Sequence, residues 1–190
     1  MIFLISGHHR ANWFHWRDPG AVPRHYNGNE FDPPIYNEHH EAEKLVTQVS
    51  KILEQNGLKT TICPFNYNLW QKIRWEKKLS HGTDDLLVSV HYNGSNNPTA
   101  TGTEVFYYRG SNQSRNKART MAKILSNTMG LRDRGAKPDT SSRYGRLGII
   151  RDTKSWSFLI EMGFITNKDD MKKVRATGVQ ALYESIKSQC

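Results

Sequence analysis

The 190-residue chain contains little cysteine and no long apolar run. Its two cysteines, Cys63 and Cys190, provide neither a disulfide framework nor a cysteine-based zinc site, and they suit a protein made in a reducing cytosol. The longest apolar runs have only the length of strands, so we expect no insertion into a membrane. The first residues, Met1 to Ile5, lack the basic region and the long apolar core of a secretory signal.

Repeats, low-complexity tracts and linkers are also missing, so residues 1–190 are expected to form a single domain. What the chain has instead is positive charge, with a formal net charge of +9. An excess of this size attracts polyanions such as nucleic acid, acidic lipid or the anionic polymers of a Gram-positive wall. The basic stretches at 72–78 and 109–123 match no nucleic-acid-binding motif, so we interpret them as solvated helical faces and expect no nucleic-acid partner.

Short apolar runs alternate with segments of helical periodicity. Apolar residues from Ala42 to Leu53 recur at helical spacing, with Asn37 as a candidate N-cap and Gly57 as a candidate stop. Further helices are expected within 66–81, over 118–129 and around 179–186, and strands over 2–6, 58–63, 86–90, 103–108, 147–150 and 156–160. This alternation predicts an α/β fold of three layers, with a central, twisted, mostly parallel sheet of about six strands and helices on both faces.

Three polar residues follow predicted strands: His8, His91 and Glu161, while Glu38 opens the first helix. Parallel neighbours place their carboxyl ends at one edge of a sheet, so these three side chains are expected to converge there. Two imidazoles and one carboxylate form a typical catalytic zinc shell, and a second carboxylate can accept a proton from water. Each position alone is more typical of an ordinary loop residue, so the spacing by itself leaves zinc a hypothesis.

Ordered motifs surround these residues. They are Ser6-Gly7-His8-His9, Asp18-Pro19-Gly20-Ala21, Asn37-Glu38, Ser89-Val90-His91-Tyr92-Asn93, Arg134-Gly135-Ala136-Lys137, Leu147-Gly148-Ile149-Ile150-Arg151 and Glu161-Met162-Gly163-Phe164-Ile165-Thr166-Asn167. In this order they resemble the zinc-dependent N-acetylmuramoyl-L-alanine amidases of the Amidase_3 family, which includes bacterial autolysins and the catalytic domains of phage endolysins. The resemblance runs from about Ile2 to Asn167, nearly the whole chain.

The resemblance implies Zn²⁺ as the cofactor, with His8, Glu38 and His91 as its ligands and Glu161 as the catalytic carboxylate. Glu38 is chosen because the family's ligand glutamate opens the first helix and because its distance to the helix-ending Gly57 fits. Nearby residues that could compete or mislead are Glu30, Glu41, Glu43, His39 and His40.

The chain departs from the family pattern around the first histidine. The family often has Asp-x-Gly-His-Gly-Gly, whereas this chain has Ile5-Ser6-Gly7-His8-His9-Arg10. The aspartate is absent, so another group must orient His8, because ligating imidazoles usually donate to a partner. His9 would replace His8 only in a differently threaded loop. The aromatic segment Trp13–Trp16, within the stretch 13–36, is not a general family feature, and it could stack on sugars or peptide stems.

The activity implied by the resemblance is hydrolysis of the amide bond between N-acetylmuramic acid and L-alanine in peptidoglycan. A related zinc carboxypeptidase or deacetylase is an alternative, and Arg143, Arg146 and Arg151 are candidates for holding a substrate carboxylate. An alternative of another class is a non-catalytic basic module that binds polyanions. We expect a monomer that acts on peptidoglycan, with anionic wall polymers as further partners. No separate wall-binding domain is visible, and synthesis in the cytoplasm without a signal peptide implies release by a holin or by lysis, as for an endolysin or an autolysin.

Overall fold

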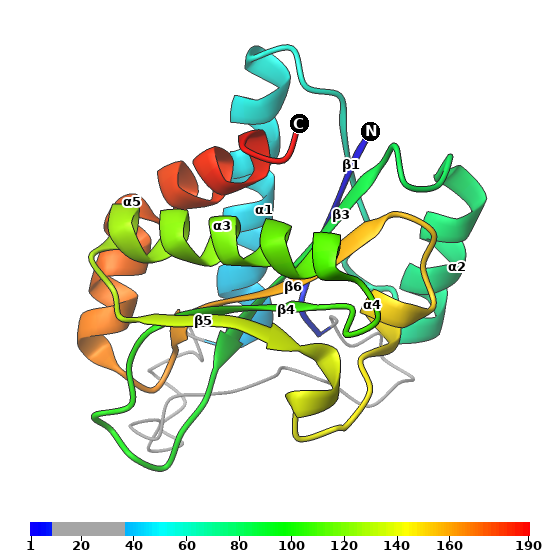
Figure 1. Ribbon diagram of the computed structural model, residues 1–190. Helices are drawn as coiled ribbons and strands as arrows, with labels where there is room; N and C mark the ends of the chain where they lie inside the picture. Colours follow the sequence, from blue (N-terminus) through cyan, green and yellow to red (C-terminus); the bar gives the residue numbers. More distant parts are fainter. Residues whose placement is uncertain (9–36) are drawn as a thin grey trace.

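The computed structural model describes residues 1–8 and 37–190, and in these residues six strands form one sheet in the order β2-β1-β3-β6-β4-β5 (Figure 1). The strands are β1 (Ile2–Ser6), β2 (Thr60–Ile62), β3 (Leu86–Asn93), β4 (Thr103–Tyr107), β5 (Asp133–Pro138) and β6 (Trp156–Phe164). β1 pairs in parallel with β2 and β3, and β3 pairs in parallel with β6. β4 is antiparallel to β6 and parallel to β5, so the predicted mostly parallel sheet is confirmed.

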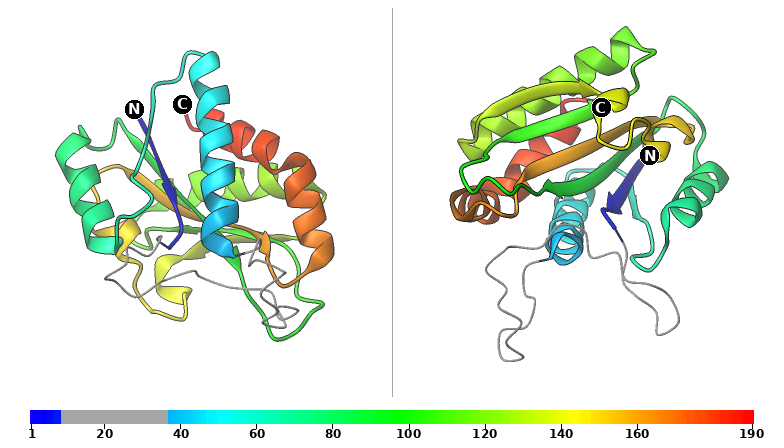
Figure 2. Two further views of the ribbon diagram at one scale, coloured as in Figure 1. Left: turned by 180° about the vertical axis from the view of Figure 1, so that it is seen from behind. Right: turned by 90° about the horizontal axis from the view of Figure 1, so that it is seen from below.

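Helices cover both faces of this sheet (Figure 2). They are α1 (Glu38–Gln55), α2 (Leu69–Leu79), α3 (Asn112–Met129), α4 (Gly148–Arg151) and α5 (Lys168–Lys187), with a 3₁₀ turn at Asp139–Ser141. Alternate residues of β1 point to opposite faces: Leu4 belongs to the core cluster that includes residues of α1, α3 and α5, whereas Phe3 and Ile5 belong to the cluster that includes residues of α2 and α4. The three-layer α/β fold is therefore confirmed. No helix in the described ranges is both long and apolar enough to cross a bilayer.

The ends of the long helices follow from their capping residues. Asn37 caps α1 as predicted, because its side chain accepts a hydrogen bond of 2.8 Å from the His40 amide. At the other end Gly57 has a φ of 78°, a left-handed conformation that favours glycine and ends the helix. Gly130 ends α3 in the same way, with a φ of 61°. The first cap matters for the site, because it fixes Glu38 as the first residue of α1.

One strand prediction is wrong, and one strand is missing from the predictions. Most of the predicted strand 147–150 lies instead in the short helix α4, Gly148–Arg151, in which the adjacent Ile149 and Ile150 are both buried. A run of four apolar residues cannot distinguish a strand from a buried helical turn by its periodicity. The strand β5 was not predicted, since Asp133–Pro138 lacks apolar alternation; it lies at the edge of the sheet, where a proline is tolerated.

The strands β3 and β6 are also longer than predicted. The sequence suggested that they end at Val90 and Ile160, but they continue to Asn93 and Phe164. His91 and Glu161 are therefore held inside the ladder, near the carboxyl ends of the two strands, rather than on the loops that follow. They are paired directly across β3 and β6, which fixes the distance between their backbones.

Candidate metal centre

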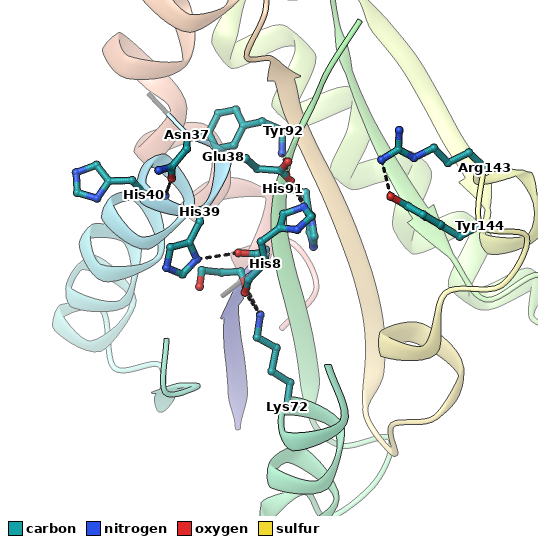
Figure 3. A network of polar contacts seen from close by, with 12 residues as sticks. His8, Asn37, Glu38, His39, His40, Lys72, His91, Tyr92, Arg143 and Tyr144 are labelled. Carbon is teal, nitrogen blue, oxygen red and sulfur yellow. Dashed lines mark hydrogen bonds and ion pairs between the residues drawn. The ribbon is translucent and has the colours of Figure 1, made fainter. Parts of the chain in front are cut away.

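Three of the predicted site residues meet at the carboxyl edge of the sheet. His8 follows β1, His91 lies on β3 and Glu38 opens α1, and Figure 3 shows the three side chains pointing toward one another. One ligand atom from each residue can be chosen such that all three lie within 4.8 Å of one another. Glu38 Oε1 lies 3.1 Å from His8 Nε2 and 2.9 Å from His91 Nδ1.

These donors fit a zinc ion. Imidazole nitrogens and a carboxylate oxygen are the donor set of many catalytic zinc sites, with bonds of about 2.0–2.1 Å. In a tetrahedral arrangement such bonds place neighbouring ligand atoms roughly 3.3 Å apart, close to the separations seen here. Glu38 is only 3% exposed, whereas the His8 and His91 side chains are 21% and 17% exposed, so the carboxylate is shielded and the two imidazoles are partly open to solvent. The residues present therefore suit the metal that the sequence predicted.

Glu38 is surrounded by donors. Burial alone would raise the pKa of its carboxyl group, but hydrogen bonds from His8 and His91 outweigh burial and hold the pKa well below its usual value. The Tyr92 amide also donates to Oε1, at 3.2 Å. As the first residue of α1, the carboxylate lies at the positive end of the helix dipole. Glu38 is therefore kept in the anionic form that binds a metal.

The imidazole of His91 is kept in its neutral form. Burial lowers the pKa of His91, and the nearby Glu38 offsets only part of that effect. The His8 and His91 rings meet edge to face, with centroids 5.2 Å apart and an interplanar angle of 71°. A neutral imidazole has one N–H and one lone pair, so Nδ1 of His91, which faces Glu38, offers its lone pair to a metal in the tautomer that carries the proton on Nε2.

Glu161 is the fourth predicted residue, and it lies beside the trio on β6, opposite His91. Its Oε2 is shielded from solvent and has no hydrogen-bond partner among the described residues. Burial, followed by the charges of Glu38 and Glu104, raises the pKa of Glu161 well above its usual value. A shielded carboxylate with a raised pKa next to three candidate ligands has the properties of a proton-transfer group.

A family model described as N-acetylmuramoyl-L-alanine amidase, Amidase_3, matches residues 2–188. The chain belongs to this family. It is 34% identical over 132 residues to an uncharacterized cell wall amidase of Bacillus anthracis, and 31% identical over 126 residues to the N-acetylmuramoyl-L-alanine amidase LytC of Bacillus subtilis strain 168. The matches cover 63% and 65% of this chain and 23% of each relative, so the chain spans about a quarter of the length of these curated relatives.

Solved amidase structures share the fold. The N-acetylmuramoyl-L-alanine amidase from Clostridium difficile 630 is similar with a TM-score of 0.76 and 22% identity, over 97% of this chain and 91% of that one. The catalytic domain of the CD27L endolysin, which targets Clostridia difficile, is similar with a TM-score of 0.70 and 25% identity, over 97% of this chain and 93% of that one. The arrangement of strands and helices around the candidate centre is thus that of the amidase fold.

The competing acidic residues of this family member have other contacts. Glu41 pairs with Arg175 of α5, with two nitrogen–oxygen distances of 3.3 Å. Glu43 Oε1 lies 2.8 Å from His39 Nε2, one helical turn away. Among the described residues, therefore, Glu38 is the glutamate of α1 that reaches His8 and His91. Glu30 and His9 lie outside the described residues, as does the aromatic segment Trp13–Trp16.

Glu104 is a charged neighbour of Glu161 that the sequence did not reveal. It is the first residue of β4 to pair with β6, directly opposite Glu161, and it is 5% exposed. Arg134 Nε donates to Glu104 Oε2 at 2.9 Å, and Asn93 Nδ2 donates to Oε1 at 3.0 Å. Neighbouring strands thus line up His91, Glu161 and Glu104. Glu104 lies beside Glu161 because β4 pairs with β6 in the antiparallel direction. Local periodicity cannot predict that pairing.

Among the three candidate arginines, two are already paired with carboxylates. Arg151 pairs with Asp139, and Arg146 with Asp152. Arg143 stacks on the ring of Tyr144, with its Cζ 4.7 Å from the centroid, and Figure 3 shows both side chains beyond β6. Arg143 also acts electrostatically on Glu161, favouring its charged form. Of the three candidate arginines, it is the one whose charge acts on Glu161.

The basic stretch 72–78 is solvated only in part. Arg74, Lys77 and Lys78 are exposed, as a solvated helical face requires, but Lys72 is 5% exposed. Its ammonium group bonds to backbone beside His8. A lysine within a charged helix gives no signal of burial in the sequence, so this contact could not be predicted.

Proposed function

We propose that this chain hydrolyses the amide bond between N-acetylmuramic acid and L-alanine in peptidoglycan, with zinc held by His8, Glu38 and His91. Membership of the amidase family over residues 2–188 supports the activity. The observation that carries the proposal is the convergence of three zinc-type ligands beside a shielded carboxylate with no partner among the described residues. Zinc, when bound, supplies Lewis-acid chemistry that polarises a carbonyl and makes water acidic near neutral pH.

Glu161 is proposed to move the proton. Its Oε2 accepts a proton from the attacking water as the water oxygen bonds to the lactyl carbonyl carbon. The same oxygen then returns the proton to the L-alanine nitrogen as the carbon–nitrogen bond breaks. The second proton of the water passes from the new lactyl carboxyl group to the amine, which leaves a lactyl carboxylate and an ammonium group. The raised pKa of Glu161 supports this role, because an acid–base group works best with a pKa near the working pH.

Hydrolysis of purified peptidoglycan, with and without a chelator, tests this proposal. Mass analysis is expected to find free stem peptides that begin with L-alanine, and their release should stop on chelation and resume when zinc is added. Release of single C-terminal amino acids would instead indicate a carboxypeptidase, for which Arg143 would be the candidate carboxylate ligand. Cleavage unaffected by the chelator would rule out the metal assignment.

We also infer that the positive surface attracts anionic wall polymers and so concentrates the enzyme at its substrate. The formal net charge of +9 supports this, since exposed lysines and arginines attract polyanions over distances limited by salt. Sedimentation with purified walls, before and after extraction of teichoic acid, measures the effect. Binding that persists unchanged after extraction would show that the charge is not responsible. Action on the wall after release from the cytoplasm stays a prediction.

A further inference from the structure

The segment Ser6–His8 must be held in an unusual conformation for His8 to reach Glu38. His8 has a φ of 55°, and among the described residues it is the one non-glycine residue with a positive φ. Side chains other than glycine adopt this left-handed conformation rarely and only where the surroundings enforce it. The conformation turns the chain at the end of β1. The contacts that enforce it therefore decide where the imidazole of His8 lies.

Two side chains from opposite faces of the sheet bind the carbonyl groups of this segment. Lys72 Nζ, from α2, donates to Ser6 O at 2.9 Å and makes a short hydrogen bond to His8 O (Figure 3). His39 Nδ1, from α1, donates to Gly7 O at 3.1 Å. Three consecutive carbonyls are thus fixed by side chains. The Gly7 amide completes the set by donating to Val90 O at 2.6 Å.

Lys72 is buried at a cost that an ordinary surface lysine avoids. An ammonium group taken out of water must be compensated by hydrogen bonds or by opposite charge. Exposed positions are available on the same helix, at Lys77 and Lys78. Lys72 instead directs its charge to two carbonyl dipoles that flank the candidate ligand. A lysine in that position strengthens the fixing of the backbone, because hydrogen bonds from charged donors are stronger than those from neutral ones.

The segment also packs against the second imidazole. A Cβ atom placed on Gly7 would lie 2.6 Å from His91 Nδ1, closer than real Cβ contacts. Backbone and ring are therefore in direct contact, and a shift of the segment would change the separation of His8 from His91. The side chains at the start of the segment do not fix it: Ile5 packs in the apolar core, and Ser6 Oγ has no hydrogen-bond partner among the described residues.

We propose that Lys72 and His39 are positioning residues that clamp the backbone on both sides of His8, so that Nε2 of His8 faces Glu38 and His91. In other zinc sites a side chain that accepts a hydrogen bond from the ligating imidazole fixes its orientation; here Lys72 and His39 would fix it by holding the backbone of His8. This inference rests on the proposed zinc site. Neither residue touches the metal or the substrate in this scheme; both act through the position of His8.

Zinc affinity of the Lys72→Met variant tests the clamp. Methionine keeps the length of the apolar stem but removes the donors, so zinc binding measured by competition with a chromogenic chelator should weaken by roughly 10–100-fold. The thermal midpoint of the zinc-free variant should not fall, because removing a buried charge also removes its desolvation cost. Lys77→Met, on the exposed face of the same helix, is the matched control and should bind zinc like the wild type.

A pair of substitutions at His39 provides an independent test from α1. Asparagine places an amide donor near the position of the imidazole Nδ1, whereas leucine has no donor, and both remove the contact with Glu43. His39→Asn should therefore keep zinc affinity near the wild-type value, and His39→Leu should lose it. The difference between the two variants isolates the bond to Gly7 O.

The outcomes separate this inference from the proposed function. A wild-type protein that binds no zinc, or a His91→Ala variant that binds it normally, would remove the proposed metal site itself. A wild-type protein that binds zinc, together with Lys72→Met and His39→Leu variants of equal affinity, would overturn the clamp alone. Failure of both variants to fold without zinc would also overturn it, since the contacts would then support the fold rather than the ligand.

Discussion

Glu38 and Glu161 are two shielded carboxylates beside His91, yet their surroundings affect them in opposite ways. Glu38, at the start of α1, accepts from His8, His91 and the Tyr92 amide, and its pKa is held well below the usual value. Glu161, on β6, has an oxygen with no partner among the described residues, and its pKa is raised well above the usual value. Burial acts on both carboxyl groups, but among the described residues side-chain and amide donors bond to Glu38 and none bonds to Oε2 of Glu161. This difference in donors is consistent with the two roles proposed for them, metal ligand for Glu38 and proton carrier for Glu161.

The charges around the two residues sharpen this difference. Glu38 itself contributes to the raised pKa of Glu161, and Glu104 adds to it, whereas Arg143 and Arg134 oppose it. A cation bound at Glu38 would offset the first of these contributions. The same residue type can thus fill two roles at one edge of a sheet, because neighbours rather than identity decide which proton state is favoured.

Replacing Glu161 should have the largest effect on activity. Glu161→Gln keeps the shape but cannot accept the proton, so hydrolysis of peptidoglycan is expected to slow by about 10²–10⁴-fold. Zinc affinity should stay at the wild-type value, because Glu161 is not a ligand in this account. Turnover and zinc binding measured on the same preparation check both points. An inactive variant that has also lost zinc would make Glu161 part of the metal site.

Replacing Glu38 should affect zinc affinity first, and activity only as a consequence. Glu38→Gln removes the anionic donor, and zinc affinity should fall by more than the roughly 10–100-fold that loss of an outer partner costs. Activity should fall with metal content and recover in part at high zinc. The matched control Glu41→Gln lies on the same helix and should bind zinc normally. Loss of zinc in this control but not in Glu38→Gln would reverse the assignment.

A substitution at Gly7 tests whether the site depends on the position of the His91 ring between Glu38 and Glu161. In Gly7→Ala the new Cβ would meet the imidazole ring, so the ring or the segment must shift. Overpacking of this kind costs about 1–3 kcal/mol of unfolding free energy, measured by urea denaturation of the zinc-free protein. Zinc affinity should fall as well. An alanine variant with wild-type stability and affinity would show that the site tolerates this shift.

The pH dependence of the unfolding free energy should also distinguish Glu38 from Glu161, and this effect is expected to be smaller than those of the preceding substitutions. Folded Glu161 keeps its proton above its ordinary pKa of 4.5, whereas the unfolded chain releases it, so rising pH favours unfolding. Glu161→Gln should therefore gain stability relative to the wild type as pH rises above 4.5, by at most about 1.4 kcal/mol per pH unit.

The contribution of Glu38 to the pH dependence of the unfolding free energy has the opposite sign to that of Glu161. The lowered pKa of Glu38 means that the folded state resists protonation, so its contribution is present above 4.5 and is lost as pH falls. Urea denaturation of the zinc-free wild type, Glu38→Gln and Glu161→Gln across this range measures both differences. Equal pH slopes for the two variants would contradict the comparison.

The sheet and the positions of the candidate ligands could be predicted because they depend on local patterns. The apolar runs at 2–6 and 86–90 specify buried strands, and Asn37 specifies where α1 begins. Parallel neighbours then bring His8, His91 and Glu161 to one edge, as expected. The α/β fold follows from the same alternation of strands and helices.

What could not be predicted depends on contacts between distant segments. Lys72 and His39 reach the His8 segment from different helices, and Glu104 reaches Glu161 through an antiparallel pairing. Residues 133–138 form a strand only because β4 supplies a partner for them. The local propensity of a segment does not depend on its distant partners, so it cannot predict such pairings, and tertiary contacts override that propensity.

A crystal structure of the zinc-loaded protein, with anomalous data collected at the zinc edge, tests the central assignment most directly. We expect one strong anomalous peak within bonding distance of His8 Nε2, His91 Nδ1 and the Glu38 carboxylate, with Glu161 nearby but not bonded to the metal. A peak at His39 and Glu43, or one that includes Glu161 among its ligands, would contradict the roles given to the two carboxylates.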